Sequence, residues 1–207
     1  MFFVEKDIDV LSKNLTKKGF RFSYFETEKE AISFIINLIP DQASIGFGGS
    51  VTVKETGLLD ALVSADKYTL LHRELCKDIS AGELYKKMHN ADWYISSTNA
   101  LCLSGDLVNI DGRANRVAAM LNGPKNVVVI CGKNKIVSNI QAGIERTRNV
   151  ATPLNCRRLN KKTPCAVTGK CMDCNSPDTI CRATVIHHHP TSDTNVHIVL
   201  INKDFGY

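Results

Sequence analysis

The sequence predicts an α/β fold, a mostly parallel sheet with helices on both faces. Helix-like and strand-like segments alternate along most of the chain, which is the order that crossover connections between parallel strands produce. In addition, the segment 126–131, Asn-Val-Val-Val-Ile-Cys, is a continuous run rich in β-branched residues. Such runs are typical of strands that are buried on both faces of a parallel sheet.

The helical segments are recognised by apolar residues that recur every three or four positions. Gly19 ends the first of them and Pro40 the second. Thr27 and Glu30 stand at the spacing of a capping box, which predicts where the second helix begins. The predicted helices are 7–18, 28–39, 55–63, 81–90, 116–121 and 140–148.

Short extended segments separate these helices, and the predicted strands are 21–25, 43–47, 68–71, 91–96, 107–110, 126–131, 184–188 and 196–201. The last two flank a turn-like segment that begins with Pro190, so we expect a C-terminal hairpin or paired edge. Between the last helix and these strands, residues 152–182 show little periodicity. We expect them to form an irregular loop.

Length and composition bound the remaining possibilities. At 207 residues the chain is long enough to fold without cross-links, and we expect one domain over 1–207 with 152–182 as a cysteine-rich, metal-binding insertion. The net charge of +5 comes from scattered basic residues without interleaved aromatics, which predicts no nucleic-acid partner. Homo-oligomerisation stays open.

The location of the protein is predicted from what its sequence lacks. The N-terminus meets acidic residues at once and has no long apolar run, unlike a signal peptide. No segment approaches the roughly 20 apolar residues of a membrane span. We therefore expect a cytoplasmic protein without membrane contacts, in which those of the eight cysteines that cluster serve metal or redox chemistry rather than disulfides.

A glycine-rich stretch at 44–55 follows the second predicted strand and leads into a helix. Gly46, Gly48 and Gly49 allow positive φ and close approach of the backbone, and Ser50 and Thr52 add hydroxyl groups. Exposed backbone N–H groups there predict a site for phosphate or carboxylate. The stretch is neither a Walker loop nor a full G-x-G-x-x-G, and a plain strand-to-helix turn would carry the same glycines.

A second polar segment follows the buried strand 91–96. In an open α/β sheet the ligand crevice lies beyond the carboxyl ends of the strands, and this segment emerges there. We expect it to face the glycine loop across one site, with side chains from Asn99, Asn109, Asp111, Asn115 and Arg116. Alternatively, Asp111 and Gly112 form only a turn and Asn115 only caps a helix.

Four cysteines of the irregular segment are predicted metal ligands. Cys165, Cys171, Cys174 and Cys181 form a C-x5-C-x2-C-x6-C pattern, which suits tetrahedral zinc or an iron–sulfur cluster. The compact, irregular spacing differs from the two C-x2-C pairs of a zinc ribbon and favours a 4Fe–4S cluster, with zinc as the alternative. Unligated thiols remain a further alternative.

The histidines near the C-terminus are a weaker metal signal. In a strand, the side chains of His187, His188 and His189 alternate between the two faces, so at most two of them point the same way. His197 on the next strand would have to join them. We expect partly exposed edge-strand histidines rather than a metal site.

Several of these motifs together resemble the lactate-utilisation (LUD) domain family. The resemblance covers about residues 30–207 and is carried by the glycine loop, Ser97-Thr-Asn-Ala, Gly105-Asp-Leu-Val-Asn-Ile-Asp-Gly, Gly132-x-Asn-Lys-Ile136 and the cysteine segment. It implies the fold of the phosphosugar isomerase and coenzyme A transferase group (NagB/RpiA/CoA transferase-like), with the glycine loop facing an anionic ligand. It also implies association with bacterial lactate oxidation, in which sister components carry iron–sulfur clusters.

A more distant likeness to sugar phosphate isomerases runs from Trp93 to Val129. In that likeness Asn99 stands where those isomerases place a catalytic aspartate. An amide does not transfer a proton at working pH, which argues against isomerase chemistry of that type.

Taken together, the residues and the resemblance predict an accessory or redox component of lactate or related hydroxy-acid oxidation. It binds a small anionic metabolite and works with iron–sulfur or redox partner proteins. The predicted ligand-binding residues are Gly46, Gly48, Gly49, Ser50, Thr52, Asn99, Asn109, Asn115 and Arg116. The alternatives are a self-standing enzyme for a phosphosugar or acyl-coenzyme A, with Glu55 or Asp111 as base, and a zinc-stabilised scaffold protein.

Overall fold

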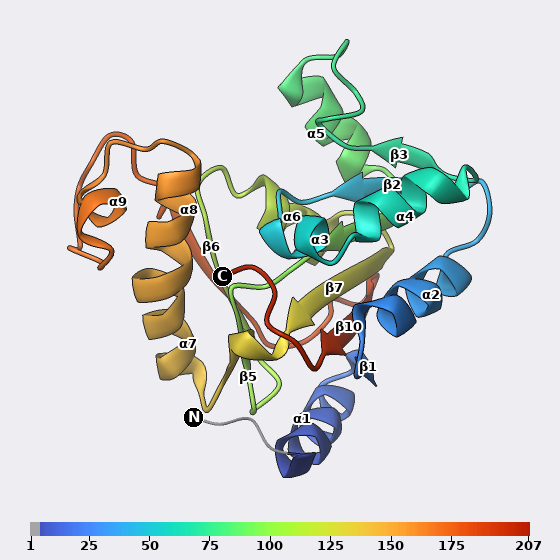
Figure 1. The fold of residues 1–207 in the computed structure, drawn as a ribbon, viewed down its shortest axis with the longest axis horizontal. Helices are drawn as coiled ribbons and strands as arrows, with labels where there is room; N and C mark the ends of the chain where they lie inside the picture. The colour runs from blue at the N-terminus through green and yellow to red at the C-terminus, as the bar shows by residue number, and fades with distance from the viewer. Residues whose placement is uncertain (1–4) are drawn as a thin grey trace.

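The main sheet has six strands, all parallel, in the order β1-β10-β7-β4-β2-β3 (Figure 1). A computed structural model describes residues 5–207. The six strands are β1 (Arg21–Phe25), β2 (Ser44–Phe47), β3 (Thr69–Leu71), β4 (Trp93–Ser96), β7 (Asn126–Gly132) and β10 (Asn195–Ile201). The expected absence of a signal peptide rests on the first residues of the chain. Of these, residues 1–4 lie outside the part that the structure describes.

A smaller sheet of four strands lies beside the main one. Its order is β8-β5-β6-β9, with β6 antiparallel to both of its neighbours and β8 parallel to β5. The strands are β5 (Ala100–Cys102), β6 (Leu107–Asp111), β8 (Ile136–Val137) and β9 (Ala183–His187). Because β5 follows β4 and β8 follows β7, the small sheet continues the chain directly from the ends of two main-sheet strands.

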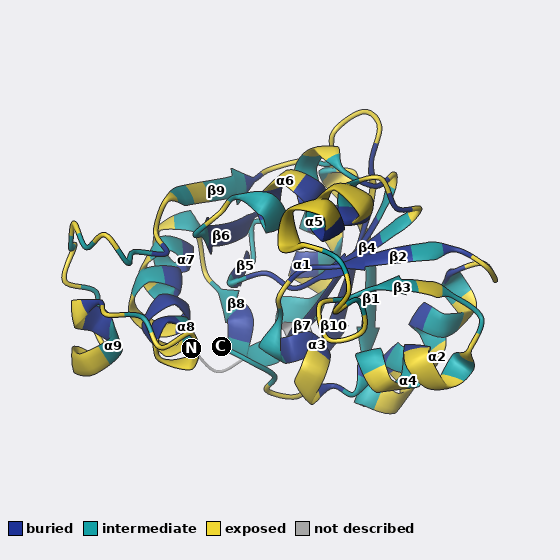
Figure 2. Ribbon diagram, turned by 90° about the horizontal axis from the view of Figure 1, so that it is seen from above, coloured by how far each residue is buried: buried dark blue, intermediate teal, exposed yellow. Residues whose placement is uncertain are grey.

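Helices cover both faces of the main sheet, as the sequence predicts. On one face α1 (Glu5–Lys17), α5 (Ala81–His89) and α6 (Asn115–Asn122) pack on alternate residues of β7 and β10. On the other face α2 (Glu28–Leu38), α3 (Val51–Glu55) and α4 (Leu58–Ala65) pack on the intervening residues. The central strands β7 and β10 are accordingly buried from their second residue onward, while the helices are exposed on their outer sides (Figure 2). The predicted α/β fold class is confirmed.

The capping box at the start of α2 is also confirmed. Thr27 Oγ1 accepts from the Glu30 backbone N–H, and Glu30 Oε2 accepts from the Thr27 backbone N–H at 3.0 Å. Two N–H groups that the helix itself leaves unpaired are satisfied, which fixes where α2 begins.

The predicted C-terminal hairpin is wrong, because β9 and β10 belong to different sheets. β9 pairs with β6 in the small sheet, whereas β10 lies inside the main sheet between β1 and β7. The sequence carried the signal for β10: Ile198-Val-Leu-Ile201 is a continuous apolar run like that of β7, and all four residues are fully buried. Such a run belongs in the centre of a parallel sheet rather than at an edge.

The expectation that 152–182 is irregular is wrong for part of the segment. A continuous helical run comprises α7 (Ile140–Arg146), a π-helical turn (Thr147–Ala151) and α8 (Thr152–Arg158), and α9 (Pro164–Thr168) follows. Pro153 does not break the run because it stands in the first turn of α8, after the wider π turn. Residues 169–182 contain no helix or strand.

No helix among residues 5–207 combines the length and the apolar character that crossing a lipid bilayer requires.

The predicted exposure of the histidines holds for His188 and His189 but is wrong for two others. His187 is 3% exposed and packs edge-on against Phe20, and neither of its ring nitrogens has a hydrogen-bond partner in the described structure. His197 is 9% exposed, with Nε2 2.9 Å from Ser23 Oγ. Its position in a central strand, rather than at an edge, accounts for this burial.

Acid is expected to destabilise the fold through His197 well above the range in which carboxylates titrate. Burial lowers the pKa of His197 from 6.5 to about 4, so the unfolded chain binds a proton there first as the pH falls. Between pH 6.5 and 4 this costs at most about 3 kcal/mol of folding free energy. Urea unfolding at several pH values measures it. We expect His197→Gln to lose most of this slope and His189→Gln, at an exposed position, to keep it.

Candidate functional site

A pocket of about 620 Å³ lies at the carboxyl ends of the parallel strands. Its walls come from the segments that follow β2, β3, β4 and β7, together with the end of β6 and the C-terminal residue Tyr207. The opposite wall is formed by α8 and by residues 177–180 and Arg182 of the cysteine-rich segment. This is the edge at which open α/β sheets place their ligands.

The glycine loop forms part of this pocket, but two of its glycines, Gly46 and Gly48, serve close packing rather than positive φ. None of Gly46, Gly48 and Gly49 has a positive φ angle, contrary to one part of the prediction. A Cβ atom on Gly46 would lie 2.8 Å from the Met88 carbonyl oxygen, and one on Gly48 would lie 2.6 Å from Ser96 Oγ. Gly49 lines the pocket, whereas Gly46 and Gly48 do not.

Two alanine substitutions in this loop are expected to differ in their effect on stability, because only one of the added Cβ atoms meets a packed neighbour. Gly46→Ala forces strand β2 away from the backbone of α5 and should cost about 1–3 kcal/mol of unfolding free energy. Gly49→Ala is the matched control, because nothing lies within 4 Å of its added Cβ. Guanidinium unfolding measures both. Equal stability of the two variants would contradict the packing role of Gly46.

Three side chains meet in a buried cluster at the base of the pocket. Lys135 Nζ donates to Thr52 Oγ1 at 2.6 Å and to Ser97 Oγ at 3.0 Å. Thr52 is 1%, Lys135 3% and Ser97 6% exposed, and all three line the pocket. Ser50 also lines the pocket, and its Oγ caps α3 by accepting from the Val53 N–H. We call Lys135, Thr52 and Ser97 the lysine cluster.

The lysine cluster holds an amine without a carboxylate partner. No ion pair joins Lys135 to an acidic group in the described residues. Burial, together with the nearby guanidinium groups of Arg146 and Arg116, lowers the pKa of Lys135 from 10.5 to about 7. A substantial fraction of this amine is therefore neutral at physiological pH.

Arg116 is a structural element of the pocket wall. Its guanidinium donates to the Ser97 and Ile110 carbonyl oxygens, at 3.0 and 2.9 Å. It also donates to Asn109 Oδ1 at 2.6 Å and to Asn99 Oδ1 at 3.3 Å. The two asparagines brace the same turn, since Asn99 N donates to Asn109 Oδ1 and Ile110 N donates to Asn99 Oδ1.

Not all of the predicted ligand-binding residues therefore present free groups. Asn99, Asn115 and Arg116 line the pocket, but Asn109 lies behind Arg116 and does not. Most donors of Arg116 are already used within the protein. These residues fix the shape of the pocket, and Arg116 adds positive charge to it.

The two predicted bases are not placed as bases. Asp111 lines the pocket, but its Oδ1 accepts from the Arg113 and Ala114 N–H groups and its Oδ2 from the Val117 N–H, so it caps α6. The alternative prediction, that Asp111 forms only a turn, therefore agrees with its contacts. Glu55 is exposed, does not line the pocket and accepts from the Gly206 N–H.

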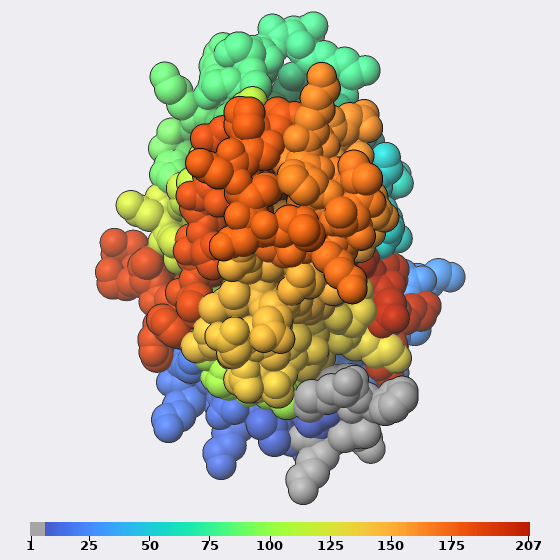
Figure 3. Space-filling view, turned by 90° about the vertical axis from the view of Figure 1, so that its left-hand side faces the viewer, coloured from blue at the N-terminus to red at the C-terminus, as the bar shows by residue number. Residues whose placement is uncertain are grey.

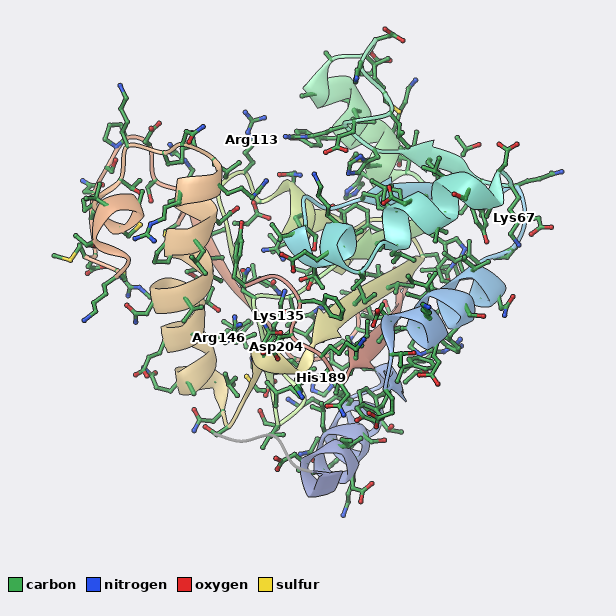
Figure 4. All side chains as sticks on the ribbon, viewed as in Figure 1. Lys67, Arg113, Lys135, Arg146, His189 and Asp204 are labelled. Carbon is green, nitrogen blue, oxygen red and sulfur yellow. The ribbon has the colours of Figure 1, made fainter. Side chains whose placement is uncertain are left out.

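The pocket lining carries a strong excess of positive charge. Its cationic residues are Arg73, Arg113, Arg116, Lys135, Arg158, Lys161 and Arg182, against two carboxylates, Asp111 and Asp178. Both carboxylates are themselves 3.6 Å from a lining cation, Asp111 from Arg116 and Asp178 from Lys161. In Figure 4 Arg113 lies at the rim between α8 and α5, whereas Lys135 lies near the centre of the molecule.

The four predicted metal ligands share one segment but differ in burial. Cys165 is buried in a small cluster with Cys156 and Ile180, Cys171 and Cys174 are half-buried, and Cys181 is exposed. Among residues 5–207, no three His, Cys, Asp or Glu side chains come together as they would around a metal ion. Burial raises the pKa of the Cys156 thiol to about 11.

The cysteine segment and the pocket are neighbours. Residues 177–180 and Arg182 line the pocket, so Cys181 lies between two lining residues. Seen from its outer side, the same segment forms a continuous face with α7 and α8 (Figure 3). The pocket and the predicted metal-binding segment are thus adjacent in the fold.

Ser97 and Lys135 were missed as site residues, although the sequence contains a signal for both. Each follows the carboxyl end of a main-sheet strand, Ser97 directly after β4 and Lys135 shortly after β7. The rule that placed Asn99 in the crevice applies equally to them. A lysine that follows a strand as apolar as β7 is therefore a candidate site residue.

Fold and pocket together define an α/β protein with a cationic pocket at the carboxyl edge of a parallel sheet. The family model of the LUD domain matches residues 8–201. The chain therefore belongs to the LUD domain family, which confirms the resemblance seen in the sequence. A comparison with curated proteins finds no match.

Two solved structures are similar to this chain. A DUF162 family protein from Deinococcus radiodurans has a TM-score of 0.56 at 11% identity, with 97% of this chain and 99% of that chain covered. Ribose 5 phosphate isomerase A from Neisseria gonorrhoeae has a TM-score of 0.36 at 16% identity, with 55% and 54% covered. At such identity the Deinococcus structure supports the fold alone.

Proposed function

We propose that this protein is a component of lactate or related hydroxy-acid oxidation that binds a small anionic metabolite in the cationic pocket. Membership of the LUD domain family suggests involvement in lactate utilisation. The observation that carries the binding proposal is the lining of the pocket, with seven Lys and Arg residues against two Asp. The proposal places the protein in the cytoplasm, where reducing conditions keep its thiols available.

The excess charge favours an anion because it is concentrated in a concave site. Both lining carboxylates already have a cationic neighbour, so they leave most of the positive charge uncompensated. Low-dielectric walls concentrate the field of such charges in a cleft and attract oppositely charged ligands. Hydroxyl and amide groups of Ser50, Ser97 and Asn99 add polar partners that orient a small carboxylate.

Isothermal titration calorimetry tests this binding. Lactate and pyruvate are titrated into the full chain, with lactamide as the uncharged control. We expect the two anions to bind, with an affinity that weakens as salt is raised, and the amide not to bind. Equal affinity for lactate and lactamide, or no heat with either anion, contradicts the proposal.

We propose in addition that Cys165, Cys171, Cys174 and Cys181 hold a metal centre, a 4Fe–4S cluster with zinc as the alternative. The donor set fits, since four soft thiols lie within 165–181. Holding one centre requires the irregular stretch 171–181 to close on Cys165. Such a centre would supply electron transfer to a redox partner protein.

Anaerobic purification followed by metal and sulfide analysis tests the metal proposal. Iron and sulfide in the wild type, lost in Cys174→Ser and retained in Cys76→Ser, are the expected result. Equimolar zinc without iron would show that the four cysteines hold a structural zinc ion instead of a cluster. Full metal content in Cys174→Ser would show that the ligand set is wrong.

A further inference from the structure

We propose that Lys135 is a nucleophile whose amine forms an imine with a 2-oxo acid in the pocket. This inference rests on the proposed function, because a 2-oxo acid is what oxidation of a 2-hydroxy acid yields. It adds a covalent step to a site proposed so far only to bind. The geometry of the lysine cluster, its burial and the charge around it carry the inference.

The hydrogen bonds of Lys135 leave its nitrogen ready to react. Two N–H groups go to the hydroxyl oxygens of Thr52 and Ser97. Thr52 Oγ1 donates in turn to the Phe205 carbonyl at 3.2 Å, so it accepts from the lysine rather than donating to it. In the neutral amine, two N–H bonds held in this way leave the lone pair for a group in the pocket that Lys135 lines.

The surroundings keep part of this amine in its reactive form. Only a neutral amine attacks a carbonyl carbon, and burial holds the pKa of Lys135 at about 7. The other lining lysine, Lys161, is less buried than Lys135, and its amine lies 3.6 Å from the Asp178 carboxylate.

The proposed step conserves atoms and electrons without an oxidant. The Lys135 nitrogen attacks the carbonyl carbon, a C–N bond forms, and the proton released by nitrogen passes to the former carbonyl oxygen. One further proton, taken up from solvent, lets that oxygen leave as water and gives a protonated imine. The hydroxyls of Ser97 and Thr52 both lie within hydrogen-bonding distance of the nitrogen and can relay these protons. The pocket cations hold the substrate carboxylate.

Reductive trapping with mass spectrometry tests the proposal on the full chain. The protein is incubated with pyruvate and sodium cyanoborohydride and then digested. We expect a carboxyethyl adduct on Lys135 in clear excess over any other lysine, with a yield that rises between pH 6 and 8. Lys135→Arg should lose this adduct, and Lys203→Met, at an exposed position outside the pocket, should retain it.

The calorimetry described above separates failure of this inference from failure of the proposed function. Pyruvate that binds but leaves no adduct on Lys135 overturns the imine and leaves the binding proposal standing. Absence of both binding and adduct contradicts the two together. Adducts spread equally over exposed lysines also overturn the inference, because they would show no special reactivity at Lys135.

Discussion

Replacing Arg116 by methionine is expected to lower the free energy of unfolding by about 3–5 kcal/mol, because the change strips a buried network of its central donor. Four acceptors depend on that guanidinium: two carbonyl oxygens and the side-chain oxygens of Asn99 and Asn109. Methionine fills much of the volume but donates nothing, so these oxygens lose bonds that water cannot easily replace. Guanidinium unfolding measures the loss.

Arg113→Met provides the matched control for this experiment. It removes the same charge three residues earlier, at the exposed rim of the pocket where Figure 4 places Arg113. Its expected effect is within about 0.5 kcal/mol, as for most surface substitutions. If Arg116→Met unfolds as easily as Arg113→Met, the asparagine and arginine network does not hold this wall in place.

Lys135 should make the stability of the protein depend on pH between pH 7 and 9. Its pKa is about 7 in the folded chain against 10.5 as the ordinary value, so the unfolded state binds the extra proton between these limits. Stability must therefore rise with pH, by about 2 kcal/mol between pH 7 and 9. Urea unfolding across that range shows the slope directly.

Lys135→Met should remove this slope, and the exposed Lys203→Met should keep it. The range ends at pH 9 because burial raises the pKa of Cys102 to about 12 and of Cys131 to about 11, so that ionising thiols weaken the fold above it. A wild type and a Lys135→Met variant with parallel profiles between pH 7 and 9 would show that the buried amine stays protonated.

The sequence predicted the main sheet well because its strands carry the strongest patterns. A strand such as β7, apolar at every position from Val127 to Cys131, fits only the centre of a parallel sheet, and the helices between strands follow from their spacing. β10 has the same pattern but was placed at an edge, because the Pro190 turn suggested a hairpin. Pairing over such a distance in the chain depends on tertiary contacts that local signals do not contain.

The pocket could be located from the sequence, but the roles of its residues could not. The rule on strand ends pointed to Asn99 and Asp111, both of which line it. Whether a polar side chain faces the cavity or braces the wall depends on partners elsewhere in the chain. Arg116 and Asp111 turned out to be occupied by backbone groups, whereas Lys135, which has only hydroxyl partners, was overlooked.

The adjacency of the pocket and the cysteine segment gives the two proposals a common geometry. Residues 177–180 and Arg182 form part of one wall of the pocket, and Cys181 lies between them in the chain. A metal centre that reorganises this segment would change the pocket, and a bound ligand would in turn affect the metal. Reduction of the centre upon addition of a hydroxy acid would require a partner that oxidises the substrate, as the proposed accessory role implies.

Backbone-amide NMR of the chain titrated with pyruvate tests most directly where an anion binds. Gly49 and Gly112 line the cationic pocket, whereas Gly19 and Gly82 do not. We expect the amide signals of the first pair to shift with the titration and those of the second pair to stay unchanged. Binding that leaves Gly49 and Gly112 unperturbed, or that shifts only the groove between α7 and Cys171, would contradict an anion site at the strand ends.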